Sequence, residues 1–293
     1  MTRGAAALSA VAGSFAITLP LTSKARGARL HGQRWMPVTA PKAVVLLAHG
    51  MFEHLGRYEH VAAHLTARGY AVYAIDHWGH GQSDGAPGSV AAFSVYDDGM
   101  EGLLRHVEVE HPRTPLFIIG HSMGGLIAAS HLLTHQGLYR GAILSGPAIM
   151  PTEMPSRVMI WISRLLSWLV PRAGVIALGA NGVSRDPAVV AAYLADPLVY
   201  KGKIGARLAA TMFDTMARVR AHAAQLHLPL LALHGDADRL AAPAGSAYLI
   251  AHAGSADKTL KLYPGLFHEI FNEPEREAVL ADASAWLDAH MPN

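Results

Sequence analysis

The sequence predicts an α/β protein, built on a mostly parallel, doubly wound β-sheet with a helical cap inserted into it. Two observations predict this class. Short runs of apolar and β-branched residues recur along the chain, each ended by a turn residue, and stretches of helical periodicity lie between them. Continuous apolar runs are typical of strands that are buried on both faces of a parallel sheet. Repeated alternation of strand and helix then implies helices on both faces of that sheet.

The core elements follow from these runs in chain order. Strands are expected at 43–48, 71–75 and 116–119, which end before His49-Gly50, Asp76 and Gly120. Further strands are expected at 142–144, 230–233 and 259–263, which end before Ser145-Gly146, His234-Gly235 and Pro264-Gly265. The helical periodicity predicts helices at 58–67, 95–111, 123–135 and 273–290.

The alternation stops between residues 151 and 225, where no strand pattern is present. Helices are expected there at 157–170, 187–194 and 204–222, the second starting with the favourable pair Asp186-Pro187. Open α/β sheets bind ligands at the carboxyl ends of their strands, so we place this insert there as a cap. The predicted organisation is a tail at 1–13, a discontinuous core at 14–150 and 226–293, and the cap at 151–225.

Two stretches bear on membrane association. Residues 158–170 are the most apolar internal stretch, but Arg164 interrupts them and a membrane-spanning helix needs about 20 apolar residues. Arg3 and residues 5–21 have the order of a signal peptide, yet polar residues dilute the apolar part and no small-residue cleavage site follows. We favour a tail that leads into a strand at 14–18, and a protein that is cytoplasmic or peripheral to a membrane.

Composition excludes several classes of function. Lys and Arg number 24 against 22 Asp and Glu, and no basic run is present, so nucleic-acid binding is not expected. The absence of cysteine excludes disulfides, thiolate nucleophiles and cysteine zinc sites. The 18 histidines contain no H-E-x-x-H pattern, because His60 and His64 have no glutamate between them at the required position. We therefore expect neither a metal nor a cofactor.

A G-x-S-x-G motif at 120–124 carries the first chemical signal. It directly follows one predicted strand and directly precedes a predicted helix, which is the setting that exposes a nucleophilic serine on a sharp turn. Ser122 is therefore the predicted nucleophile. The oxyanion that forms when it attacks an acyl group needs backbone N–H donors. We expect them from Met123, the next residue, and from Met51 in the loop after the strand at 43–48.

A serine nucleophile also needs a base and a carboxylate to orient that base. Two later strand-end loops supply them. His268 follows the strand at 259–263, and both Asp236 and Asp238 follow the strand at 230–233. The order serine, acid, histidine is that of a strand-based hydrolase site. At this point either aspartate is a candidate for the acid.

Seven segments together resemble the monoacylglycerol lipases of the α/β-hydrolase superfamily, and most closely the bacterial, mycobacterial-type members. They are HGMFEHLGRY at 49–58, DHWGHGQS at 76–83, GHSMGG at 120–125, SRDP at 184–187, DPLV at 196–199, LHGDADRL at 233–240 and YPGLFHE at 263–269. The resemblance extends from about residue 28 to the end of the chain. It implies an α/β-hydrolase fold with an inserted helical cap, and Asp238 as the catalytic acid.

The resemblance also implies how substrate is held. Glu53 and Arg57 would bind the glycerol end, with Tyr193 of the cap beside them. For Glu53 and Arg57 a salt bridge that braces the oxyanion loop is an equal interpretation, and the two roles are compatible. The implied reaction is hydrolysis of the ester bond of monoacylglycerols to a fatty acid and glycerol through an acyl-enzyme. A broader carboxylesterase or a lysophospholipase is the alternative within enzymes, and a non-catalytic lipid-binding relative is the alternative outside them.

The predicted helix at 157–170 is apolar around about two thirds of its circumference. Such a helix is buried, covers a lipid tunnel or enters a membrane interface. We favour a lid whose Trp161, Leu165 and Trp168 make transient contact with a membrane or micelle, over a helix packed into the core. The expected partner is thus a lipid substrate, and the sequence predicts no oligomeric state.

Overall fold

Eight strands form the central sheet of the structure, a computed structural model that describes residues 11–20, 22–152 and 164–292. Across the sheet they are β1 (Val11–Thr18), β2 (Arg29–Met36), β4 (Tyr70–Ile75), β3 (Ala43–Ala48), β5 (Leu116–His121), β6 (Gly141–Ser145), β9 (Leu230–Gly235) and β10 (Lys258–Tyr263). The strands from β4 to β10 run parallel, and β1 and β2 extend one edge antiparallel. The predicted mostly parallel sheet is confirmed.

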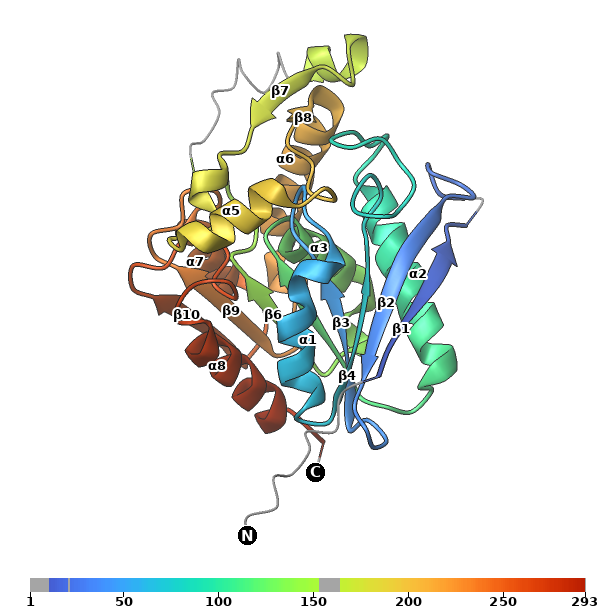
Figure 1. The fold of residues 1–293 in the computed structure, drawn as a ribbon, viewed down its shortest axis with the longest axis vertical. Helices are drawn as coiled ribbons and strands as arrows, with labels where there is room; N and C mark the ends of the chain where they lie inside the picture. The colour runs from blue at the N-terminus through green and yellow to red at the C-terminus, as the bar shows by residue number, and fades with distance from the viewer. Residues whose placement is uncertain (1–10, 21, 153–163, 293) are drawn as a thin grey trace.

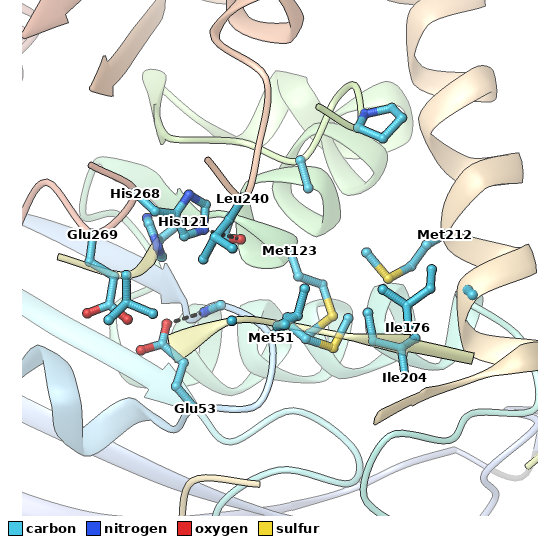
Figure 2. A pocket seen from close by; sticks show the side chains of 18 of the residues that line it. Met51, Glu53, His121, Met123, Ile176, Ile204, Met212, Leu240, His268 and Glu269 are labelled. Atoms are coloured by element: carbon cyan, nitrogen blue, oxygen red, sulfur yellow. Dashed lines mark hydrogen bonds between the residues drawn. The ribbon is translucent and has the colours of Figure 1, made fainter. Parts of the chain in front are cut away.

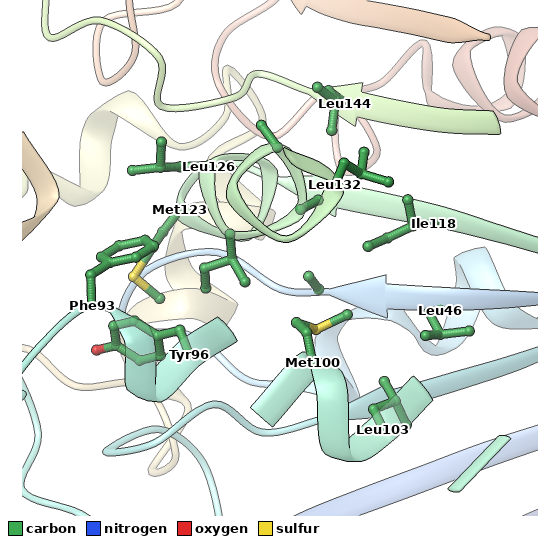
Figure 3. Close-up of a cluster of buried hydrophobic side chains, with 14 of the residues drawn as sticks. Leu46, Phe93, Tyr96, Met100, Leu103, Ile118, Met123, Leu126, Leu132 and Leu144 are labelled. Carbon is green, nitrogen blue, oxygen red and sulfur yellow. The ribbon is translucent and has the colours of Figure 1, made fainter. Parts of the chain in front are cut away.

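Helices cover both faces of this sheet (Figure 1). On one face lie α2 (Ser94–Glu110), α3 (Met123–His135) and α7 (Pro243–His252), and on the other lie α1 (Glu59–Thr66) and α8 (Arg276–Ala289). Every residue of the central strand β3 is buried, with Leu46 in one apolar cluster and Leu47 in the other. In Figure 3, Leu46 and Ile118 of the sheet lie beside Met100 of α2. Burial on both faces explains why these strands are continuous apolar runs.

The cap segment lies at one end of the sheet (Figure 1). It contains β7 (Gly174–Ala177), α5 (Pro187–Ala195), β8 (Lys203–Gly205) and α6 (Ala206–Ala221), and residues 164–169 are helical. Asp186 caps α5 as expected, because its side chain accepts a hydrogen bond from the Ala188 N–H at 2.8 Å. The expectation of a cap without strands was wrong, since β7 and β8 pair antiparallel. Strands of four and three residues are too short to show a pattern in the sequence.

The structure corrects the core in three further places. The first strand begins at Val11 and not at residue 14, because all of β1 pairs with β2 and Val11 lies opposite Met36. β2 was not predicted, since its charged and polar residues alternate with buried ones on an outer part of the sheet. α7 was not predicted either, because its ten residues are mostly small or apolar and form no clear apolar stripe.

Within residues 11–20, 22–152 and 164–292, no helix is long and apolar enough to cross a membrane.

Candidate active site

Ser122 lies at the sharp turn between β5 and α3. Its backbone has φ 54° and ψ −117°, and a positive φ is uncommon for any residue other than glycine. The flanking glycines make the turn sterically possible. A Cβ on Gly120 would lie 2.4 Å from the carbonyl oxygen of Gly124, and a Cβ on Gly124 would lie 2.1 Å from that of Ala48. The turn therefore needs both glycines of the motif and holds the serine hydroxyl away from the strand.

Two other strand-end loops bring a histidine and an aspartate to this serine. Nε2 of His268 lies 2.7 Å from Oγ of Ser122, and Nδ1 of His268 lies 2.6 Å from Oδ2 of Asp238. Asp236, the other candidate acid, is exposed, and its Oδ1 accepts a hydrogen bond from the Gly265 N–H instead. The structure thus brings Ser122, His268 and Asp238 into one chain of hydrogen bonds and leaves Asp236 outside it.

Local contacts fix the charge states of this chain. Burial alone would raise the pKa of Asp238, but His268 and His234 hold it well below its ordinary value. Oδ1 of Asp238 also accepts hydrogen bonds from the Leu240 and Ala241 N–H groups at 2.8 and 3.0 Å. Burial alone would lower the pKa of His268, but Asp238, with Glu269 and Glu53, outweighs burial and raises that pKa. The arrangement therefore pairs a stable carboxylate with a base that readily accepts a proton.

The two predicted oxyanion donors flank the serine. Met123 is the first residue of α3, where a backbone N–H has no acceptor within the helix. Met51 follows β3 in a turn where Phe52 has φ 67°, and both methionines line the same pocket as Ser122. Glu53 braces this turn, because its Oε1 accepts a hydrogen bond from the Gly50 N–H at 2.6 Å. Both N–H groups belong to segments that the fold holds in place.

The residues implied for the glycerol end form a buried ion-pair cluster. Nη1 of Arg57 lies 2.8 Å from Oε2 of Glu53 and 2.6 Å from Oε1 of Glu269, and Nη2 lies 2.7 Å from Oε2 of Glu269. The aromatic ring of Tyr193, on cap helix α5, lies 4.7 Å from the Arg57 guanidinium carbon. The salt bridge between Glu53 and Arg57 is thus present. Glu269 was not singled out from the sequence, although it directly follows His268.

Two buried histidines beside the triad were also missed. Nε2 of His234 lies 3.0 Å from Oδ2 of Asp238, and its Nδ1 lies 2.7 Å from Oγ of Ser246. The ring of His121 lies 4.7 Å from that of His268, and burial lowers the pKa of His121 to about 3. His121 is therefore neutral and does not compete with His268 for protons. The sequence did contain a signal for each of them: His121 directly precedes the nucleophile, and His234 lies at the end of a strand.

One pocket joins these groups, and its two ends differ in character (Figure 2). Glu53, His121, His268 and Glu269 lie at one end. Apolar side chains line the other end, among them Ile176, Ile204, Met212, Phe213 and Met216, and most of these belong to the cap. The figure shows Met51 and Met123 between the two groups. Such a pocket fits a ligand with a polar head and an apolar tail.

The part of the predicted lid that the structure describes is largely exposed. Leu165 is 40% exposed and Trp168 is 75% exposed, whereas Ser167 is buried. The backbone carbonyl of Ser167 accepts hydrogen bonds from the Arg207 side chain of α6 at 2.7 and 2.9 Å. Residues 164–170 are therefore not packed into the core, which was the alternative expectation for this helix. Trp161, the third predicted lid residue, lies outside the described residues.

Among the described residues, no group of three histidine or acidic side chains is placed to hold a metal ion. His60 and His64, the helical pair in the sequence, contact separate partners. Nε2 of His60 lies 2.7 Å from the Phe271 carbonyl, and Nε2 of His64 lies 3.2 Å from Oγ of Ser284. These contacts connect α1 to the C-terminal region of the chain.

Comparison with known proteins adds four similarities. The family model described as serine aminopeptidase, S33, matches residues 39–275. A monoacylglycerol lipase of Mycolicibacterium smegmatis is 43% identical over 265 residues, covering 90% of this chain and 95% of that protein. A monoglyceride lipase of Mus musculus is 33% identical, covering 92% and 90%. The crystal structure of a monoacylglycerol lipase of Paleococcus ferrophilus superimposes with a TM-score of 0.79 at 30% identity, covering 89% of this chain and 99% of that one.

Proposed function

Because the chain belongs to the serine aminopeptidase S33 family of α/β-hydrolases, and within it to the monoacylglycerol lipases, we propose that it hydrolyses monoacylglycerols to a fatty acid and glycerol. The family, the fold class and the ester-hydrolase activity predicted from the sequence are confirmed by these similarities. One observation carries the assignment of the reaction to this site. It is the unbroken chain of hydrogen bonds from Ser122 through His268 to Asp238 at the floor of a pocket with one polar and one apolar end.

The reaction follows from that geometry. Oγ of Ser122 attacks the acyl carbonyl carbon while Nε2 of His268 takes the hydroxyl proton, and Asp238 stabilises the resulting imidazolium. The N–H groups of Met51 and Met123 bind the oxyanion. The C–O bond to glycerol then breaks, and His268 gives its proton to the leaving oxygen. A water molecule, deprotonated by His268, attacks the acyl-serine in the same way and releases the fatty acid.

The two ends of the pocket orient the substrate. Glu53 and Glu269 face the leaving glycerol, whose hydroxyls donate hydrogen bonds that carboxylates accept. The acyl chain enters the apolar end, which Ile176, Ile204 and Met212 line. In this arrangement Tyr193 closes the glycerol end from the cap side.

We assign residues 151–225 the role of a cap over the acyl site. Its exposed Leu165 and Trp168 are placed to contact the lipid surface from which the substrate comes. The protein then acts at the surface of membranes or micelles and needs no cofactor.

Purified protein should release fatty acid from 1-monoacylglycerols, and Ser122→Ala should abolish that release. A panel of 1-oleoylglycerol, lysophosphatidylcholine, p-nitrophenyl esters and aminoacyl anilides separates the related activities. Faster turnover of lysophosphatidylcholine or of an aminoacyl anilide than of the monoacylglycerol would contradict the proposal. Failure of a fluorophosphonate to label Ser122 in the folded protein would instead favour a non-catalytic lipid-binding protein.

A further inference from the structure

The polar end of the pocket carries more negative than positive charge. Glu53 and Glu269 both line the pocket together with Ser122 and His268, and Arg57 lies behind them, in contact with both. Two carboxylates and one guanidinium leave one negative charge in excess. Among the described residues that line this pocket there is no lysine or arginine. A substrate headgroup therefore meets carboxylates and not a cation.

Arg57 is not free to bind an anionic ligand. Glu269 holds it with two parallel hydrogen bonds at 2.6 and 2.7 Å, the geometry of a strong bidentate pair, and Glu53 adds a third at 2.8 Å. The Tyr193 ring covers the guanidinium from the cap. The Arg57 side chain is only 11% exposed. A phosphate could reach this guanidinium only by displacing a carboxylate that is already optimally paired.

The two carboxylates are held as hydrogen-bond acceptors. Glu53 accepts from the Gly50 N–H and from the Tyr58 hydroxyl, both at 2.6 Å, as well as from Arg57. Glu269 accepts from the Asn272 side-chain amide at 2.9 Å in addition to Arg57. Every partner of these two carboxylates is a hydrogen-bond donor, so both side chains act as acceptors here. Burial alone would lower the pKa of Arg57, but Glu53 and Glu269 raise it, so Arg57 stays charged.

We propose that Glu269, together with Glu53, makes the headgroup end of the pocket an anion filter. It admits esters whose alcohol is neutral or cationic, and rejects esters whose alcohol carries a phosphate, such as acylglycerol phosphates. The proposal rests on the hydrolysis of monoacylglycerols proposed above. Two unit charges about 6 Å apart at an effective dielectric constant of about 20 repel each other by the equivalent of roughly 100-fold in binding. A phosphate at the polar end meets a repulsion of that order from the one negative charge that Arg57 leaves uncompensated in the cluster.

The test compares two esters that differ only in the phosphate. We would measure kcat/KM for 1-decanoylglycerol and for 1-decanoylglycerol 3-phosphate below their critical micelle concentrations, so that attraction to a lipid surface plays no part. Decanoylcholine serves as a cationic third substrate. The variant is Glu269→Gln, which removes the charge and keeps the size of the side chain. The matched control is Glu275→Gln, which removes the same charge from a half-exposed residue paired with Arg185 outside the pocket.

Wild-type protein should prefer the glycerol ester over its phosphate by at least about 100-fold. Glu269→Gln should raise the ratio of kcat/KM for the phosphate ester to that for the glycerol ester by at least about tenfold. The same variant should lower the ratio of kcat/KM for decanoylcholine to that for the glycerol ester. Glu275→Gln should leave both ratios within about twofold of wild type. Equal hydrolysis of both glycerol esters by the wild type, or an unchanged ratio in Glu269→Gln, would overturn the filter while leaving the proposed function intact. No hydrolysis of 1-decanoylglycerol by the wild type would overturn both.

A second measurement needs no variant and covers the case that Glu269→Gln does not fold. Non-hydrolysable ether analogues, 1-O-decylglycerol and its 3-phosphate, would compete with a neutral chromogenic ester in the wild-type protein. The filter predicts that the phosphate analogue inhibits at least about tenfold more weakly, and that added salt narrows the difference because it screens the repulsion. Equal inhibition by the two analogues would contradict it.

Discussion

The two ends of the pocket are built in different ways. Directional contacts hold the polar end, where ion pairs of 2.6–2.8 Å join Glu53, Arg57 and Glu269, all from segments of the core that follow β3 and β10. The other end is lined by apolar side chains, among them Met212 and Ile204 from the cap. Methionine side chains repack around ligands of different length, whereas buried ion pairs do not move without a large cost. We therefore expect steep discrimination between headgroups and shallow discrimination between acyl chains.

At the polar end of the pocket, several contacts join the cap to the core. His54 of the core lies 2.8 Å from Asp196 of the cap, and the Glu269 N–H donates to the Val183 carbonyl at 2.8 Å. Tyr193 adds its contact with Arg57. In contrast, Leu165 and Trp168 are exposed. The end of the cap that faces the headgroup is thus held against the core. The segment around residues 164–170 instead exposes apolar side chains that can contact lipid.

The largest expected effect concerns the acid of the triad, which the sequence alone left between two aspartates. Asp238→Asn should lower kcat by on the order of 10⁴-fold, because an asparagine favours the wrong tautomer of His268. Asp236→Asn, the matched control two residues earlier in the same loop, should stay within about twofold of wild type, since the Asp236 side chain is exposed and accepts its hydrogen bond from the Gly265 N–H. Steady-state kinetics on 1-oleoylglycerol checks both. A large loss in the second variant and none in the first would reverse the assignment.

The second-largest effect concerns how much the ion pairs of the polar end contribute to the stability of the fold. Arg57→Met should lower the free energy of unfolding by about 3–5 kcal/mol, because it leaves two buried carboxylates without their partner. Denaturant unfolding of variant and wild type gives the difference. Arg164→Met is the control, since Arg164 and its partner Asp214 are both more than half exposed. Similar stability of the two variants would show that the cluster is not what organises this end.

A smaller effect is expected at the apolar end. Met212→Trp should fill part of the acyl site, so that the ratio of kcat/KM for a 16-carbon chain to that for an 8-carbon chain falls about tenfold. The ratio of kcat/KM for a glycerol ester to that for a methyl ester of the same chain length should not change, because Met212 lies at the apolar end. A change in that second ratio of the same size would mean that the two ends are not independent.

The smallest effect is on pH dependence. Catalysis needs neutral His268, so kcat/KM falls as the pH drops through the pKa of this residue. Asp238, Glu269 and Glu53 together outweigh burial and hold that pKa above its ordinary value of 6.5. Removing a neighbouring negative charge favours the neutral imidazole, and Glu269→Gln should therefore move the acid limb to lower pH by less than about one unit. Glu275→Gln should leave the limb in place, and a shift to higher pH in Glu269→Gln would contradict the sign.

The sequence predicted the parts of the molecule whose pattern is local. Strands such as β3 and β5 are buried on both faces and so are apolar throughout, and the loops that follow them carry Ser122, Asp238 and His268 at recognisable places. The elements that it missed are defined by their partners. β2 is a polar strand ordered by pairing with β1 and β4, and β7 and β8 are too short to carry a pattern.

The site shows the same division. A glycine-flanked serine can be recognised from the sequence alone, but the role of Glu269 depends on its ion pair with Arg57, which is 212 residues away in the chain. His234 is similar, because only the fold brings its Nε2 to Asp238 while the Ser246 hydroxyl holds the other nitrogen. Charge balance in a pocket is a property of several loops together. It therefore required the structure.

The most direct test of the central claim is to label the protein with a fluorophosphonate and to follow 1-oleoylglycerol hydrolysis in the same sample. Peptide mapping should place one label per chain on Ser122, and activity should be lost in proportion to the labelled fraction. A saturating amount of 1-oleoylglycerol should slow the labelling, because both molecules need the same pocket. Hydrolysis that persists in fully labelled protein, or a label that maps to another residue, would contradict the account.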